Sequence, residues 1–124
     1  MDLDARLADV ERRYDELTAR MADPATAADP DLLRRTGKDL SELEDIVVPF
    51  RRYREARRQA EEARELAAAE ADGEMVAYLR GEADAAERAA DALRTTLEEL
   101  LVPKDPNDAK DVVVEIRAGA GGQE

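Results

Sequence analysis

The chain has 124 residues, which gives room for one small domain and the beginning of a second. Charged residues make up 40% of it and aromatic residues 3%, a balance that favours long solvated helices with a narrow apolar seam over a thick globular core. The net charge of −12 argues against burial of the whole surface on nucleic acid phosphates, and the absence of cysteine and histidine excludes disulfides, thiol nucleophiles and most zinc sites.

The first predicted helix covers residues 3 to 21. Its apolar residues recur at intervals of four and three, which places them along one side of a helix: Leu3, Leu7, Val10, Tyr14, Leu17 and Met21. Asp2 is placed to cap its start. The stripe ends before residues 22 to 30, where Pro24 and Pro30 predict a loop.

A second helix is predicted to begin with Asp29 as its N-cap and Pro30 at its first position. Its apolar stripe consists of Leu33, Leu40, Leu43, Val47, Phe50, Tyr53, Ala60, Ala63 and Ala67. Pro49 lies inside this pattern and removes one backbone hydrogen bond, so we expect a kink or a short break near residues 46 to 49. Two helices in tandem are the alternative. Gly73 is a candidate for the residue that ends this helix.

Five arginines follow the proline within residues 51 to 58: Arg51, Arg52, Arg54, Arg57 and Arg58. One interpretation is a contact for RNA or for an acidic protein surface. The other is a solvated helix face on which Arg57 pairs with Glu61 and Arg58 pairs with Glu62, at i,i+4 spacing. We favour the second, because such exposed pairs are common and contribute only tenths of a kcal/mol, roughly.

The third predicted helix has the most regular seam, formed by Val76, Leu79, Ala83, Ala86, Ala90, Leu93, Leu97 and Leu100. Small alanines allow a neighbouring helix to approach closely but bury little area, so we expect firmer packing near Leu93 to Leu101 than in the middle. Short connections between long amphipathic helices predict an all-α fold, an elongated antiparallel three-helix bundle with coiled-coil-like packing. A coiled coil that binds itself or a partner is the competing explanation.

The segment from residue 103 to residue 124 does not have a helical pattern. Pro103 and Pro106 are expected to end the third helix, and a β-branched run predicts a strand: Val112, Val113, Val114 and Ile116. A lone strand leaves its backbone groups unpaired, so it requires a sheet that these residues do not encode. We therefore expect a helical domain over 1–102, a linker over 103–110 and the truncated start of a second, α+β domain over 111–124.

The same segment contains two motifs, P-K-D-P-N-D and V-V-V-E-I-R-A-G-A-G-G-Q-E. They resemble the junction between the first and second domains of the bacterial class-1 peptide chain release factors, where P-K-D-P-x-D precedes E-[IV]-R-A-G-x-G-G-x-E. Arg117, where the sister type has histidine, favours the release factor 1 type, which acts at UAA and UAG. The resemblance extends over the whole chain, although its specific motifs lie in the last twenty or so residues.

The resemblance implies a role in translation termination. In that family the complete protein enters the ribosomal A site, recognises the stop codon through a P-x-T tripeptide, and promotes hydrolysis of peptidyl-tRNA through a Gly-Gly-Gln loop. We expect neither element in these residues, so the helical domain would serve as an outer contact arm toward the stalk side of the ribosome. The implied partners are the ribosome with its rRNA and proteins, and, through the missing domains, the mRNA stop codon and peptidyl-tRNA.

Gly121, Gly122 and Gln123 spell the catalytic tripeptide of that family. We interpret this as a coincidence, because the catalytic tripeptide of the family lies far downstream in a G-P-G-G-Q context, whereas this one follows R-A-G-A. A terminal tripeptide also has nothing to hold it against an ester. We therefore expect no catalytic, cofactor-binding or metal residue in the chain and no cofactor, with a small hydrolase loop as the rival interpretation of the tail.

The remaining expectations concern location and assembly. The start M-D-L-D-A-R-L is charged and no apolar run approaches membrane-spanning length, which predicts a cytoplasmic protein that does not bind membranes. We expect a monomer. The alternative function is a free-standing helical interaction module of the coiled-coil kind, which would form oligomers as its concentration rises.

Overall fold

The computed structural model describes residues 2–102, which form four helices in the order α1 (Leu3–Met21), α2 (Pro24–Ala27), α3 (Pro30–Ala69) and α4 (Gly73–Leu101). This confirms the helical prediction for that part of the chain. The linker over 103–110, the strand over 112–116, the glycines that follow it and Gln123 all lie outside the described residues and remain predictions. Within residues 2–102, no helix is both long and apolar enough to cross a lipid bilayer.

Each helix begins directly after an aspartate whose carboxylate accepts a backbone N–H of the first turn. The four bonds run from Ala5 N to Asp2 at 2.8 Å, Ala25 N to Asp23 at 2.9 Å, Leu32 N to Asp29 at 3.2 Å and Glu74 N to Asp72 at 3.1 Å. An aspartate here satisfies an otherwise unpaired donor and adds a negative charge at the positive end of the helix dipole. The predicted caps Asp2 and Asp29 are therefore confirmed.

Two expectations about the connections are wrong. Residues 22 to 30 are not all loop, because Asp23 caps α2 and Pro24 occupies its first turn, where the missing N–H of proline costs nothing. Gly73 does not end the preceding helix. It is the first residue of α4, and α3 ends at Ala69 with Glu70 in an extended conformation as its cap. Asp72 determines this boundary, since it caps the helix that follows it.

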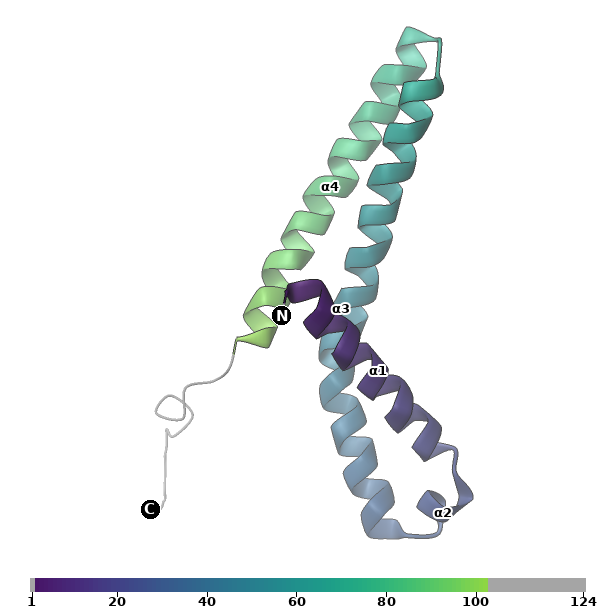
Figure 1. The fold of residues 1–124 in the computed structure, drawn as a ribbon, viewed down its shortest axis with the longest axis vertical. Helices are drawn as coiled ribbons and strands as arrows, with labels where there is room; N and C mark the ends of the chain where they lie inside the picture. Colours follow the sequence, from purple (N-terminus) through teal and green to yellow (C-terminus); the bar gives the residue numbers. More distant parts are fainter. Residues whose placement is uncertain (1, 103–124) are drawn as a thin grey trace.

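Helix α3 is the axis of the molecule (Figure 1). Helix α1 packs along its first half, and α4 returns antiparallel along its second half, so α1 and α4 cover successive lengths of the same helix. They meet near the middle, where the Arg6 guanidinium donates to the backbone carbonyl of Leu101 at 2.8 Å. The fold is an elongated helical bundle, as predicted, and within residues 2–102 the three long helices come together at this junction.

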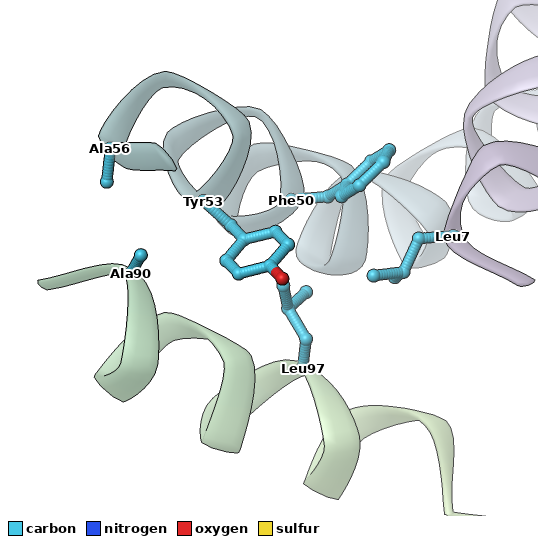
Figure 2. Close-up of a cluster of buried hydrophobic side chains, with 6 residues drawn as sticks. All are labelled: Leu7, Phe50, Tyr53, Ala56, Ala90 and Leu97. Carbon is cyan, nitrogen blue, oxygen red and sulfur yellow. The ribbon is translucent and has the colours of Figure 1, made fainter. Parts of the chain in front are cut away.

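The main core lies at the junction (Figure 2). Six buried residues from the three helices form it, and they are Leu7, Phe50, Tyr53, Ala56, Ala90 and Leu97. Beyond it, toward the α3–α4 turn, the buried residues are alanines: Ala60, Ala63, Ala67 and Ala83. Large side chains bury more apolar area than alanines, so the hydrophobic stabilisation is concentrated at the junction. This agrees with the expectation of firmer packing near Leu93 to Leu101.

The apolar seams predicted for α1 and α3 are buried or half-buried throughout. In α4 the prediction is wrong at one residue: Leu100 is 42% exposed, while Leu101 packs against the core. The apolar seam of α4 continues from Leu97 to Leu101, four residues further on, and not to Leu100 as expected. The reason is that the start of α1 lies against the side of α4 that carries Leu101. Ala56 is a buried residue that the seam did not include.

Helix α3 continues without a break through Pro49. Of the kink or short break expected near residues 46 to 49, the break is therefore absent and the alternative of two tandem helices is wrong, while the kink stays a prediction. The neighbours Val47 and Phe50 are buried in the core on one side of the helix. Asp45, whose carbonyl loses its intrahelical donor, lies at the surface where water can replace that donor. Packing on one side and solvent on the other allow the helix to accommodate the proline.

Candidate functional site

The candidate site is the surface on which the arginines of α3 meet α1, which we call the arginine surface: Arg51, Arg54, Arg57 and their carboxylate partners Glu11, Asp15 and Asp4. It is the part of the described chain in which the sequence left a functional and a structural interpretation open. The other candidate, Gly121 to Gln123, lies outside the described residues. No group of three or more metal-ligating side chains is found within residues 2–102.

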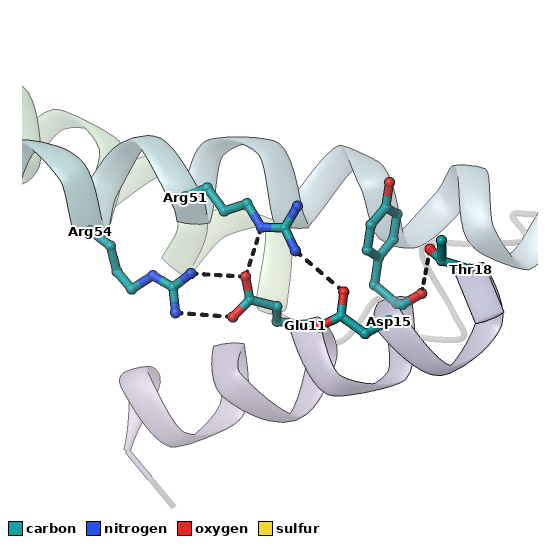
Figure 3. Close-up of polar contacts among 6 residues, drawn as sticks. Glu11, Asp15, Thr18, Arg51 and Arg54 are labelled. Carbon is teal, nitrogen blue, oxygen red and sulfur yellow. Dashed lines mark hydrogen bonds and ion pairs between the residues drawn. The ribbon is translucent and has the colours of Figure 1, made fainter.

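Glu11 of α1 is the centre of the arginine surface (Figure 3). Its carboxylate accepts Nε–H of Arg51 at 2.7 Å and both terminal N–H groups of Arg54 at 3.0 and 2.9 Å. The second contact is the paired geometry that a guanidinium makes with a carboxylate. Arg51 also donates to Asp15 at 3.4 Å, and its guanidinium lies 5.5 Å from the centre of the Tyr14 ring, within cation–π range. These contacts hold α1 against α3.

The environment of Glu11 favours its charged form. Only 15% of its side chain is exposed, and this burial raises its pKa. The hydrogen bonds and charges of Arg51 and Arg54 outweigh burial, so the pKa lies below its ordinary value of 4.5. Glu11 therefore stays ionised at neutral pH and keeps both arginines engaged.

Tyr53 joins all three long helices. Its buried hydroxyl accepts hydrogen bonds from Arg57 at 3.2 Å and from Arg94 of α4 at 3.0 Å, while Arg57 also contacts Asp4 of α1 at 3.2 Å. A hollow of about 340 Å³ beside it is lined by three arginines and three carboxylates: Arg57, Arg64, Arg94, Glu61, Glu87 and Asp91. The opposite charges balance, so this hollow is not a basic anion pocket.

The structure shows which carboxylates most of these arginines contact. Arg58 contacts Glu62 at 3.5 Å, as predicted from the i,i+4 spacing. Arg57 is paired with Asp4 of α1 and not with Glu61, so this predicted pair is wrong. Arg52 forms no ion pair within residues 2–102. Arg51, Arg54 and Arg57 thus pair with carboxylates of α1, which spacing along one helix could not reveal.

The letters P-x-T do occur in the chain, at Pro24, Ala25 and Thr26, contrary to expectation. The structure places them in α2, where Ala25 N donates to the capping Asp23. Thr26 is buried, so its hydroxyl cannot be presented to a nucleotide base. This tripeptide is part of the turn between α1 and α3 and not a codon-reading element.

Replacing Glu11 by glutamine is expected to lower the free energy of unfolding by about 1 kcal/mol at neutral pH, because two arginines lose their shared partner. The pKa of Glu11 is lower in the folded state, so its contribution is present above pH 4.5 and is lost as the pH falls through the folded-state value. Urea unfolding at several pH values measures both effects. Glu16→Gln is the control, since Glu16 makes one weak contact at 3.8 Å. Equal losses in the two variants would contradict the central role of Glu11.

The comparisons with known proteins agree on one family. The model of the PCRF domain matches residues 10–124. Similar proteins include Peptide chain release factor 1 of Acidobacterium capsulatum, 47% identical over 119 residues, which are 96% of this chain and 33% of that protein. Peptide chain release factor 1 of Geobacillus sp. strain WCH70 is 41% identical and that of Bacillus subtilis is 37% identical, each over 96% of this chain and 33% of the relative. The chain thus spans about a third of the length of these relatives, and no solved structure matches it at a significant level. With most of its residues matched by that model, the chain belongs to the PCRF domain family.

Proposed function

We propose that this chain is the N-terminal region of a bacterial peptide chain release factor of the release factor 1 type. The observation that carries the proposal is 47% identity, over 96% of the chain, to a relative with that name. The complete protein would bind the ribosome in the cytoplasm as a monomer, act at UAA and UAG, and promote hydrolysis of peptidyl-tRNA. Codon reading and catalysis would belong to domains of the complete protein that follow the PCRF domain.

Within this assignment, residues 1–102 form the helical first domain, 103–110 the linker and 111–124 the start of the second domain. The helical domain would act as an outer arm that contacts the ribosome. Two features support this role. Helix α3 has 40 residues, which at about 1.5 Å per residue gives a rod of roughly 60 Å. The arginines of α3 pair with carboxylates of α1, which joins the two helices in one arm.

The test is a release assay with the complete protein on ribosomes that carry a labelled peptidyl-tRNA and a chosen codon in the A site. We expect release on UAA and UAG and only background release on UGA. Release on UGA with none on UAG would assign the protein to the sister type. Absence of release on all three codons would contradict the proposed function.

Gln123 is proposed to be structural, so Gln123→Ala in the complete protein should change the release rate by about twofold at most, within the range of a residue outside the chemistry. A loss of a hundredfold or more, on the order expected for a group that stabilises the transition state, would show that the terminal tripeptide takes part in catalysis. Measuring the maximal rate at saturating protein separates this from weaker ribosome binding.

The second candidate is a free-standing interaction module, and the observation in its favour is a set of exposed apolar side chains on α3 and α4: Leu66, Met75 and Tyr78. Sedimentation of the 124-residue chain over a range of concentrations distinguishes the two candidates. Growth into oligomers would support the module. A monomer at all concentrations would support the arm of a larger factor.

A further inference from the structure

The C-terminal end of α4 is poorly supported by its own sequence. Its last turn contains Glu98 and Glu99 and no basic residue, so further negative charge accompanies the negative end of the helix dipole. Val102 closes the helix with one long hydrogen bond, from its N–H to the Glu99 carbonyl at 3.4 Å. The other carbonyls of the last turn have no donor within the helix. An end of this kind frays unless another part of the molecule holds it.

Arg6 of α1 supplies the positive charge that this end lacks. Its guanidinium donates to the Leu101 carbonyl at 2.8 Å, and it forms no ion pair within residues 2–102 that would compete for the contact. Among the described residues, it is the one side chain that donates to a backbone carbonyl of a different helix. A cation at the last carbonyls of a helix is favourable. The contact therefore caps α4 from outside.

The start of α1 is held in the place that this contact requires. Asp4 is paired with Arg57 of α3 at 3.2 Å, and Leu3 packs against the junction core, as Leu101 does from α4. The first turn of α1 lies near the last turn of α4 (Figure 1), so the positive end of one helix dipole meets the negative end of the other. Packing, ion pairing and dipoles thus all join these two helix ends.

We propose that α1 is a clasp that keeps the last turn of α4 helical, with Arg6 as its positioning residue, and that it thereby fixes the point at which the chain leaves the helical domain. The inference rests on the proposed function, since it concerns how the arm is joined to the domain that follows. Unwinding of four residues would lengthen this connection by about 7 Å, because a residue advances about 1.5 Å in a helix and about 3.3 Å when extended.

The first test is amide hydrogen exchange at residues 98–101 of the complete protein with Arg6→Gln. Arg6 is exposed, so the unfolding midpoint should stay nearly unchanged. We expect these amides to exchange about fivefold faster, as for loss of one charged hydrogen bond, while amides near the α3–α4 turn keep their wild-type rates. Unchanged exchange at residues 98–101 would overturn the proposal.

Two further variants accompany this test. Arg6→Lys keeps a positive charge and a donor, so it should restore slow exchange at the end of α4. Arg13→Gln is the matched control, because Arg13 is an exposed arginine of the same helix whose contact, with Glu16 at 3.8 Å, lies within α1. It should leave α4 unaffected. Equal acceleration by Arg13→Gln would show a general effect of charge and overturn the role of Arg6.

The second test measures the joint itself. Spin labels at Ala71→Cys, in the α3–α4 turn, and at Glu115→Cys, in the proposed second domain, report the distribution of distances between these sites in the complete protein. We expect one narrow distribution, to which Arg6→Gln adds distances that differ by up to about 7 Å and which Arg6→Lys restores. A contact with only local importance would alter exchange and not this distribution, so an unchanged distribution would overturn the proposal.

Both readouts are independent of release activity. A wild-type distance distribution already as wide as that of Arg6→Gln would overturn the clasp and leave the proposed function intact. A complete protein that showed both effects of Arg6→Gln but released no peptide would support the clasp and contradict the proposed function.

Discussion

Leu97→Ala should destabilise the chain by about 3 kcal/mol, as expected for a large-to-small change in a tightly packed core. Leu97 has no exposed surface and lies where all three long helices meet, in contact with the cluster around Leu7, Phe50 and Tyr53. The rest of the seam is mainly alanine, so little other core can compensate for the cavity. Urea unfolding followed by circular dichroism measures the loss, which would be a large part of the stability of a small domain.

Leu100→Ala is the matched control for this change. It removes the same atoms from the same helix, but Leu100 is 42% exposed and lies outside the core cluster. We expect a change of about 0.5 kcal/mol or less. If the two variants lost equal stability, the end of α4 would be packed with the spacing of three predicted from the sequence and not as the structure has it.

Pro49→Ala should stabilise the chain by about 2 kcal/mol. The substitution restores an N–H that can donate to the Asp45 carbonyl inside a helix that is already continuous, and alanine is about 3 kcal/mol more favourable than proline in a helix interior. Part of the gain is offset, since removing a proline increases the conformational entropy of the unfolded chain. A higher midpoint in thermal and urea unfolding is the expected result.

The control for Pro49 is Pro24→Ala. Pro24 is in the first turn of α2, where no intrahelical hydrogen bond is lost, so the exchange should bring no gain in stability. Should Pro49→Ala instead destabilise the chain, the ring of Pro49, which is half-buried, would be contributing more through its packing than it costs the helix.

Much of the fold could be predicted because its signals are local. The apolar spacing from Leu3 to Met21 predicts α1 and its buried side, and the side chains of Asp2 and Asp29 predict where two helices begin. The failures at Gly73 and residues 22 to 30, and the absence of a break at Pro49, concern choices that neighbouring structure decides. A proline can be accommodated when one side of its helix is packed and the other is solvated, and no local pattern reports that.

The arginine surface could be predicted only in outline. Spacing along a helix identifies Arg58 with Glu62, which lie one turn apart. It cannot identify Arg57 with Asp4, whose positions differ by 53 in the sequence, or the two arginines that share Glu11. Such pairs depend on how α1 is placed against α3. The excess of positive charge in residues 51 to 58 was the signal available in the sequence, and it did not indicate which carboxylates the arginines contact.

The bond between Arg6 and the Leu101 carbonyl joins residues that are 95 positions apart. During synthesis the N-terminal helix leaves the ribosome first, yet the groups that it contacts on α4 are made last. The α3–α4 hairpin forms from neighbouring segments, whereas closure of the junction has to wait for nearly the whole domain. A chain that stopped before Leu101 could pack α1 on α3, but it would lack the acceptor of Arg6 and the side chain of Leu101 that packs against the junction core.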